Sequence, residues 1–232
     1  MSIDTATLGA IVTAIGGLGM AACALVDTTK TLPGGGVSNT GFDAIEAAVR
    51  IFLPDAAREP GTPGLAASLL YTLHSNWING VAAADQKAIA KSLIKLRLNP
   101  ETSARYASAA DVDPAALEEV ARRMVTGTPL EAQHTNALGR LDLALTAILD
   151  AAYHRADQRY RNVSKTWSAV VAMLLAGFGG IAVADPGSHY SVTAQMLLAL
   201  FCGILAVPLA PITKDLTSAL SAGVKLAQTL KR

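Results

Sequence analysis

Two uncharged stretches near the C-terminus decide the fold class: WSAVVAMLLAGFGGIAVA at residues 167–184 and VTAQMLLALFCGILAVPLA at residues 192–210. A third such stretch, ATLGAIVTAIGGLGMAACALV, occupies residues 6–26. A transmembrane helix needs about 20 mainly apolar residues, with a range of about 17–25. All three stretches fall in that range. The sequence therefore predicts an all-α membrane protein with three transmembrane helices.

The composition of the chain agrees with a membrane location. Of the 232 residues, 16% are charged, against about 25% in an average soluble domain. Mean hydropathy is +0.37. Because net charge is only +1 and aromatic residues make up 5%, we expect no nucleic-acid partner. The alternative, three buried helices in one soluble core, fits three uncharged stretches of this length poorly.

The first stretch differs from a secretory signal peptide. Such a signal has a positively charged start and an apolar core of about 7–15 residues. Here the chain begins MSIDTAT, with an aspartate and no basic residue, and the apolar stretch is longer. Met20-Ala21-Ala22-Cys23 is only faintly similar to a lipoprotein processing site. We expect an uncleaved transmembrane helix.

Basic residues predict the orientation, because Lys and Arg accumulate in cytoplasmic segments beside the membrane. Residues 27–165 hold 15 of the 19 basic residues, and the C-terminal tail holds the other four. The N-terminal tail and residues 184–191 hold none. We therefore expect a multi-pass inner-membrane protein with its N-terminus outside and its C-terminus in the cytoplasm.

This membrane topology divides the chain into four segments. We expect an N-terminal transmembrane helix at 1–27 and a helical cytoplasmic domain at 28–165. A transmembrane hairpin at 166–211 and an amphipathic cytoplasmic helix at 212–232 complete the chain. The cytoplasmic domain is expected to end in a long stalk helix that begins near Pro129, because its apolar residues recur at three- and four-residue steps. No Pro or Gly lies between Gly139 and Gly177, so we expect this helix to run into the second span.

The glycine-rich segment TLPGGGVSNTG, residues 31–41, has two interpretations. A phosphate-binding loop would require a Gly-Lys-Ser/Thr sequence, which does not follow. We therefore expect a flexible linker. After it, Phe42, Ile45, Val49 and Phe52 predict one apolar helix face. Asp113-Pro114 predicts a helix start, because an acidic N-cap precedes proline at the first helical position.

Small residues recur along the three predicted spans. In lipid, helices associate through small residues that allow close backbone approach. The stripes either pack the three spans of one chain together or face a neighbouring subunit, and we expect a homo-oligomer. Pore-lining or helix-packing candidates are Gly9, Thr13, Gly16, Gly17, Ala172, Ala176, Gly180 and Gly203.

One basic stripe stands out in the predicted cytoplasmic domain: Lys87, Lys91, Lys95 and Arg97. The three lysines are spaced four residues apart and so share one helix face. Contact with anionic lipid headgroups is one interpretation. An ordinary solvated face is the other.

Patterns of catalysis and metal binding are weak. The spans contain no charged residue, which argues against a pump or an ion-coupled transporter. No GxSxG or HExxH sequence occurs. Asp150, His154 and Asp157 share a helix face but make a poor metal site, because no cysteine or second histidine is near in sequence. We expect no enzyme activity, no cofactor and no metal.

Two functions fit these features, and the first is the one that the sequence favours. The first is a homo-oligomeric channel or pore, with the first spans around an axis and the cytoplasmic helices as its gate. The second is a non-conducting structural scaffold or anchor that self-assembles, contacts membrane lipids, and binds a cytoplasmic partner or shapes the membrane.

Overall fold

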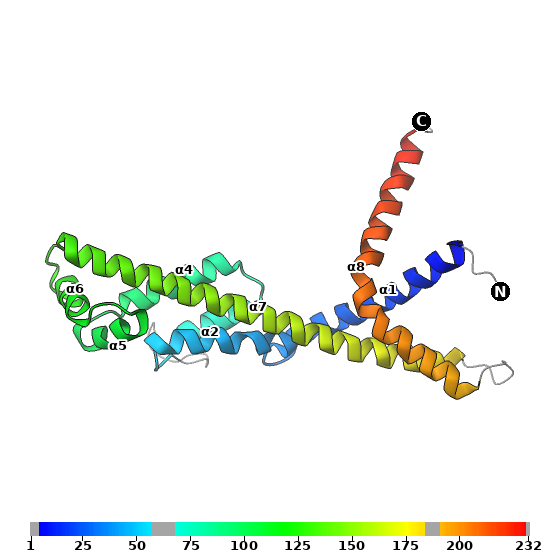
Figure 1. The fold of residues 1–232 in the computed structure, drawn as a ribbon, viewed down its shortest axis with the longest axis horizontal. Helices are drawn as coiled ribbons and strands as arrows, with labels where there is room; N and C mark the ends of the chain where they lie inside the picture. Colours follow the sequence, from blue (N-terminus) through cyan, green and yellow to red (C-terminus); the bar gives the residue numbers. More distant parts are fainter. Residues whose placement is uncertain (1–4, 57–67, 184–190, 231–232) are drawn as a thin grey trace. The chain divides into compact units, whose positions relative to one another are not determined.

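The computed structural model describes residues 5–56, 68–183 and 191–230, and within these ranges it is all-helical with no strand (Figure 1). Three helical segments, Gly9–Thr31, Ala132–Ala182 and Val192–Asp215, are long and apolar enough to cross a membrane. These are the three helices that the uncharged stretches predict. The α-helices are α1 (Thr5–Thr28), α2 (Asn39–Phe52), α3 (Leu69–Ile78), α4 (Ala83–Leu96), α5 (Pro100–Ala110), α6 (Pro114–Thr126), α7 (Ala132–Val183) and α8 (Val192–Leu230).

Two units make up the chain. The helical domain comprises Gly34–Tyr160, and the span unit comprises Met1–Pro33 together with Arg161–Arg232. Helix α7 is continuous through 52 residues, so it belongs to both units. It begins three residues after Pro129, where the stalk helix was expected to start, and it does run on into the second apolar stretch as expected.

The expected boundary between residues 211 and 212 is not marked by a helix end. Helix α8 continues from the third apolar stretch into the C-terminal tail, with Pro208 and Pro211 in its interior. Each proline removes a backbone hydrogen bond, which bends a helix without necessarily ending it. Figure 1 shows α8 changing direction along its length.

The helical domain has a core of large apolar side chains. Phe42, Ile45, Val49 and Phe52 of α2 are at most 1% exposed, which confirms the predicted apolar face. Leu141, Leu145 and Leu149 of α7 face the same core. The phenol of Tyr106 is buried there as well and donates a hydrogen bond to the Ile94 carbonyl oxygen at 2.9 Å. Burial raises the pKa of this phenol to about 12.

Polar caps define the short helices. The Asp113 carboxylate accepts hydrogen bonds from the backbone N–H groups of Ala115 and Ala116, which confirms the predicted start of α6. Helix α5, which the sequence analysis missed, starts in a similar way. The Asn99 side chain accepts from the Thr102 N–H, and the Thr102 hydroxyl accepts from the Asn99 N–H. Its Asn-Pro pair was a readable signal of the same kind as Asp-Pro.

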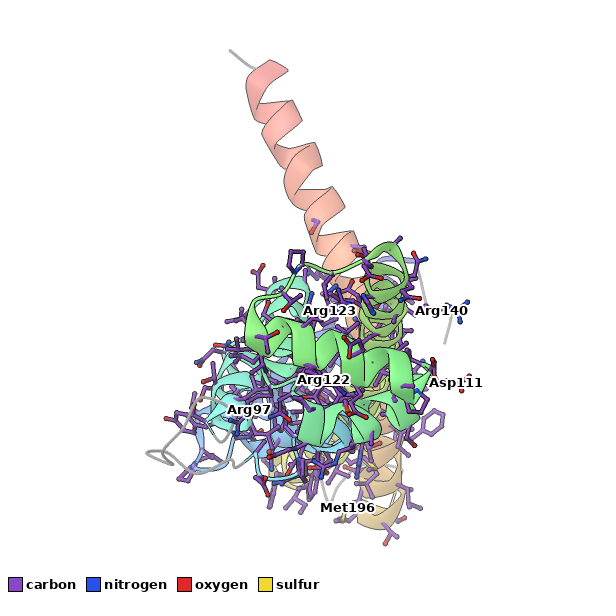
Figure 2. The ribbon with its side chains drawn as sticks, turned by 90° about the vertical axis from the view of Figure 1, so that its left-hand side faces the viewer. Arg97, Asp111, Arg122, Arg123, Arg140 and Met196 are labelled. Atoms are coloured by element: carbon purple, nitrogen blue, oxygen red, sulfur yellow. The ribbon has the colours of Figure 1, made fainter. Side chains whose placement is uncertain are left out.

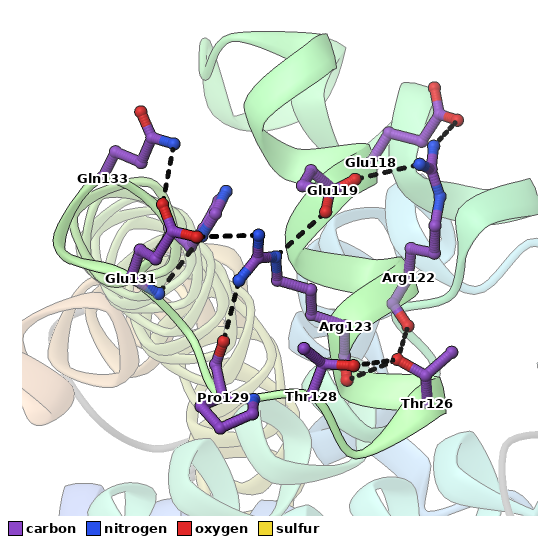
Figure 3. A network of polar contacts seen from close by, with 10 residues as sticks. Glu118, Glu119, Arg122, Arg123, Thr126, Thr128, Pro129, Glu131 and Gln133 are labelled. Atoms are coloured by element: carbon purple, nitrogen blue, oxygen red, sulfur yellow. Dashed lines mark hydrogen bonds and ion pairs between the residues drawn. The ribbon is translucent and has the colours of Figure 1, made fainter.

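An arginine closes the turn between α6 and α7 (Figure 3). The Arg123 guanidinium bonds Glu119 Oε1 at 2.9 Å and Glu131 Oε1 at 2.8 Å. It also donates to the Pro129 carbonyl oxygen at 2.9 Å. These bonds hold the pKa of the Glu119 carboxyl below its usual range. The Arg123 side chain therefore links the end of α6 to the residues just before α7.

The glycine-rich segment forms an ordered turn, so its interpretation as a flexible linker was wrong. Gly34 and Gly35 have φ angles of 85° and 80°, which favour glycine, and Gly35 packs on the Ile78 side chain. Helix α2 then begins at Asn39, inside the expected linker. At Gly41, a Cβ atom would lie 2.5 Å from the Ala156 carbonyl oxygen. That position therefore lets α2 approach α7 closely.

Candidate functional site: small-residue contacts among the long helices

Helix α1 packs on α8 through two glycines. A Cβ atom on Gly19 would overlap the Ala206 carbonyl oxygen, and one on Gly16 would overlap the Thr213 hydroxyl. Both glycines are therefore needed for the two backbones to come this close. The Thr213 hydroxyl is buried and lies 3.4 Å from the Val12 carbonyl oxygen, to which it donates. The Thr213 side chain therefore lies in the α1–α8 contact, and its hydroxyl is hydrogen-bonded to α1 of the same chain.

Helix α8 meets α7 through further small residues. A Cβ atom on Gly203 would lie 2.7 Å from the Met173 Cα and 2.9 Å from the Ala172 carbonyl oxygen. A Cβ atom on Gly180 would lie 2.7 Å from the Ala199 Cβ. Ala176, also on α7, is partly buried. These two helices are in close contact at both glycines.

One alanine from each long helix fills the centre of the span unit. Ala22 of α1, Ala172 of α7 and Ala206 of α8 are all 0% exposed. The Ser168 hydroxyl is buried beside this region on α7 and has no hydrogen-bond partner. Ile15, Leu18, Val171 and Val207 pack against these alanines, so the contact is closed.

The remaining candidates of α1 lie on another face. A Cβ atom on Gly9 or Gly17 would meet nothing within 4 Å, and Thr13 is exposed. These three residues are spaced four apart and so form one stripe, which we call the open face of α1. The predicted packing or pore-lining residues of α1 therefore lie on two different faces of the helix. Gly16 contacts α8, whereas Thr13 is exposed and a Cβ on Gly9 or Gly17 would meet no atom within 4 Å in the described part of the chain.

Some residues of these contacts were missed by the sequence analysis. Gly19 follows Gly16 by three residues, a helical spacing that was readable in the sequence. Ala22 and Ala206 are two among many alanines in the spans, so composition alone could not select them. Thr213 lies beyond the third uncharged stretch, where no packing contact was expected.

The basic stripe of α4 is bonded to α7. Lys91 Nζ lies 3.0 Å and Lys95 Nζ 2.9 Å from the Asp142 carboxylate. Lys87 Nζ lies 2.5 Å from Asp150 Oδ1. The lysines hold the pKa values of both aspartates below their ordinary range. Arg97 follows the end of α4 and is exposed. Contact of this basic stripe with lipid headgroups stays a prediction. Its three lysines already form ion pairs with aspartates of α7.

Metal chemistry gains no support within the described residues. Among them, no group of three or more His, Cys, Asp or Glu side chains is placed to hold an ion. Asp150, one of the weak candidates, bonds Lys87 instead.

The chain matches no known protein family, no curated protein and no solved structure.

Proposed function

We propose that this protein is a non-enzymatic membrane scaffold that assembles with copies of itself and holds its helical domain on the cytoplasmic side of the bilayer. The observation that carries the proposal is the closed contact of Gly16 and Gly19 with α8. A pore lined by these glycines would need them to face water. They are instead covered by the Ala206 and Thr213 positions, which supports a packing role.

The apolar outer surface of the span unit supports the proposal that lipid surrounds it. Large apolar side chains are exposed there, including Leu174 at 56%, Phe178 at 69% and Leu198 at 65%. Soluble proteins rarely leave such a continuous apolar surface in water. Trp167, at the start of the second apolar stretch, is 53% exposed, and tryptophan is enriched at membrane interfaces. The basic residues that precede it support the inside-facing orientation.

Self-assembly is supported by the open face of α1. Small residues at four-residue steps are typical of helix–helix contacts in lipid, because they allow close backbone approach. Gly9, Thr13 and Gly17 are arranged this way, and within the described residues space is open beside the two glycines and Thr13 is exposed. A second α1 helix is the partner that this geometry fits best.

A channel is the second candidate, and the same face favours it. Thr13 carries an exposed hydroxyl between two glycines, and glycine exposes backbone carbonyl groups. Several copies arranged around an axis would line a polar path with these groups.

The particle mass tests the scaffold. We expect native mass spectrometry of the full chain in phosphatidylcholine nanodiscs to give a defined oligomer. Gly17→Leu, on the open face, should yield smaller particles, because the larger side chain prevents close approach. Gly179→Leu is the matched control, since a Cβ at Gly179 also meets nothing within 4 Å but lies on α7. A monomeric wild-type particle would contradict the proposal.

Conductance separates the two candidates. We expect no current across planar bilayers that contain the reconstituted oligomer, at any voltage. A current that disappears in the Thr13→Leu variant would replace the scaffold with the channel.

A further inference from the structure

Helix α7 has three distinct faces within the helical domain. Leu141, Leu145 and Leu149 face the core, and Asp142 and Asp150 bond the lysines of α4. The third face points away from the core and borders the face bonded to α4, because Asp142 lines the same groove as Gly139 and Leu143. Its residues are spaced four apart and all are exposed: Gly139, Leu143, Ala147 and Ala151. We call them the outer stripe.

The outer stripe has an unusual composition for a surface helix. The solvent face of such a helix normally carries charged and polar residues. Here it carries a glycine, two alanines and Leu143, which is 71% exposed. Small side chains give a flat helix surface on which a second helix can lie with its backbone close.

Two arginines flank the outer stripe. Arg140 stands at its N-terminal end and Arg155 at its C-terminal end, and both are exposed. Figure 2 shows Arg140 at the surface of α7. Fifteen residues of helix separate them, which is roughly 22 Å at 1.5 Å per residue. The Arg155 Nε donates to the Ala151 carbonyl oxygen at 3.1 Å. Within the described residues, neither guanidinium forms an ion pair.

The acidic residues near the stripe are already bonded. Between residues 136 and 155, which are all described, the carboxylates belong to Asp142 and Asp150. Both are paired with lysines of α4. The charges left available beside the outer stripe are therefore positive.

A groove opens beside the N-terminal half of the stripe. It has a volume of about 720 Å³, and Lys95, Gly139, Arg140, Leu143 and the lysine-paired Asp142 are among the residues that line it. A Cβ atom on Gly139 would meet nothing within 4 Å, so none of the described residues fills the space beside it. It has room for apolar side chains of a docked helix next to a basic rim.

We propose that the outer stripe docks an acidic amphipathic helix of a partner protein, about 16 residues long, with carboxylates near both ends. The proposal rests on the scaffold function and names its partner. Carboxylates at the two ends would pair with Arg140 and Arg155, and small or apolar residues between them would lie on the stripe.

Charge argues against the two nearest alternative occupants. A second copy of this helix brings arginines of its own and no available carboxylate, so like charges would meet. The chain's C-terminal segment carries Lys225, Lys231 and Arg232 and so presents the same sign of charge.

A selection experiment identifies the chemistry of the occupant. A display library of helical 20-residue peptides is selected against the full chain in phosphatidylcholine nanodiscs, with empty nanodiscs for counter-selection. We expect the enriched peptides to carry acidic residues at both ends and an apolar stripe between them. Enrichment of neutral or basic peptides, or no enrichment over empty nanodiscs, would overturn the proposal.

Charge reversal then locates the binding surface. For an enriched peptide, fluorescence anisotropy should show binding weakened at least about tenfold by Arg140→Glu with Arg155→Glu, because like charges would face each other. Exchanging the peptide's glutamates for lysines should restore binding to this variant. Arg105→Glu, an exposed arginine of α5, is the matched control and should leave the affinity unchanged. Equal binding to wild type and the double variant would overturn the proposal.

A bulky substitution tests the stripe itself. Ala147→Trp should weaken peptide binding at least about tenfold by holding the helices apart, as overpacking does in a closely fitted contact. Ala104→Trp, at an exposed alanine of α5, should not. If the double arginine variant lowers only the attachment of nanodiscs to phosphatidylglycerol vesicles, the stripe faces lipid and the proposal is wrong. Particle mass measured on the same samples separates the two ideas. An oligomer that binds no peptide overturns only the docking, and a monomer that binds it overturns only the assembly.

Discussion

The helical domain and the span unit bury side chains of different size. In the helical domain, fully buried positions hold large residues such as Phe42, Tyr106 and Leu145. In the span unit, Ala22, Ala172 and Ala206 occupy the centre, and glycines mark the closest approaches. Ion pairs and caps surround the first unit, whereas large apolar side chains cover the outside of the second.

The proposed membrane location of the span unit explains the contrast. In water, burying a large apolar side chain is favourable by about 1.5–3 kcal/mol, so a soluble domain gains stability from big residues inside. In lipid that gain is absent, because the tails are as apolar as leucine. Helices there associate through close van der Waals contact, which small residues permit. One chain therefore shows two packing chemistries, and helix α7 has residues in both units.

The largest effect is expected from removing a large core side chain. Leu145→Ala should lower the free energy of unfolding of the helical domain by about 2–5 kcal/mol, through lost burial and the cavity left behind. Leu143→Ala, two residues away on the outer stripe, should change it by less than about 0.5 kcal/mol. Denaturant unfolding of the full chain in detergent micelles measures both. Equal losses would show that the core was misplaced on α7.

A smaller but still large effect is expected from adding one methyl group to the span unit. Gly19→Ala should cost about 1–3 kcal/mol, because the new Cβ would overlap the Ala206 carbonyl oxygen. Gly179→Ala adds the same group where space is open, and alanine's higher helix propensity should leave stability equal or slightly raised. Thermal unfolding in nanodiscs compares the two. If Gly19→Ala is as stable as Gly179→Ala, the close α1–α8 contact is absent.

The smallest effect is expected from the ion pairs between α4 and α7. Asp142 has a pKa held low in the folded state by Lys95 and Lys91. Such a group stabilises the fold above the ordinary aspartate pKa, and this stabilisation is lost as pH falls through the folded-state pKa. Because the carboxylate is partly exposed, Asp142→Asn should cost only about 0.5–1 kcal/mol at neutral pH and less in high salt.

A pH series of thermal midpoints checks this sign. The wild type should lose more stability on acidification than Asp142→Asn does. Asp85→Asn, at the exposed start of α4, is the control and should follow the wild type. Parallel curves for wild type and Asp142→Asn would show that the pairs contribute nothing measurable.

The sequence predicted correctly those features that depend only on residues close together in the chain. The Asp113 cap, the apolar face of α2 and the three apolar helices each depend on neighbours within a few turns, and each was readable. The flexible linker was wrong for a different reason. Gly35 is ordered by Ile78, which lies more than 40 positions away, and no local pattern reports that contact. The partners of Lys87, Lys91 and Lys95 were hidden in the same way, because aspartates on a distant helix supply them.

The sequence by itself determined that the chain is helical and that three of its helices suit a membrane, because hydropathy, charge and helix caps act over short stretches. Only the tertiary structure decided which small residues form helix–helix contacts. Gly16 and Gly19 meet α8, while Gly9 and Gly17 stay open, although all four are the same residue in the same helix. A helix face has no assigned neighbour until the other helices are placed, and only then does a glycine become a contact or a free surface.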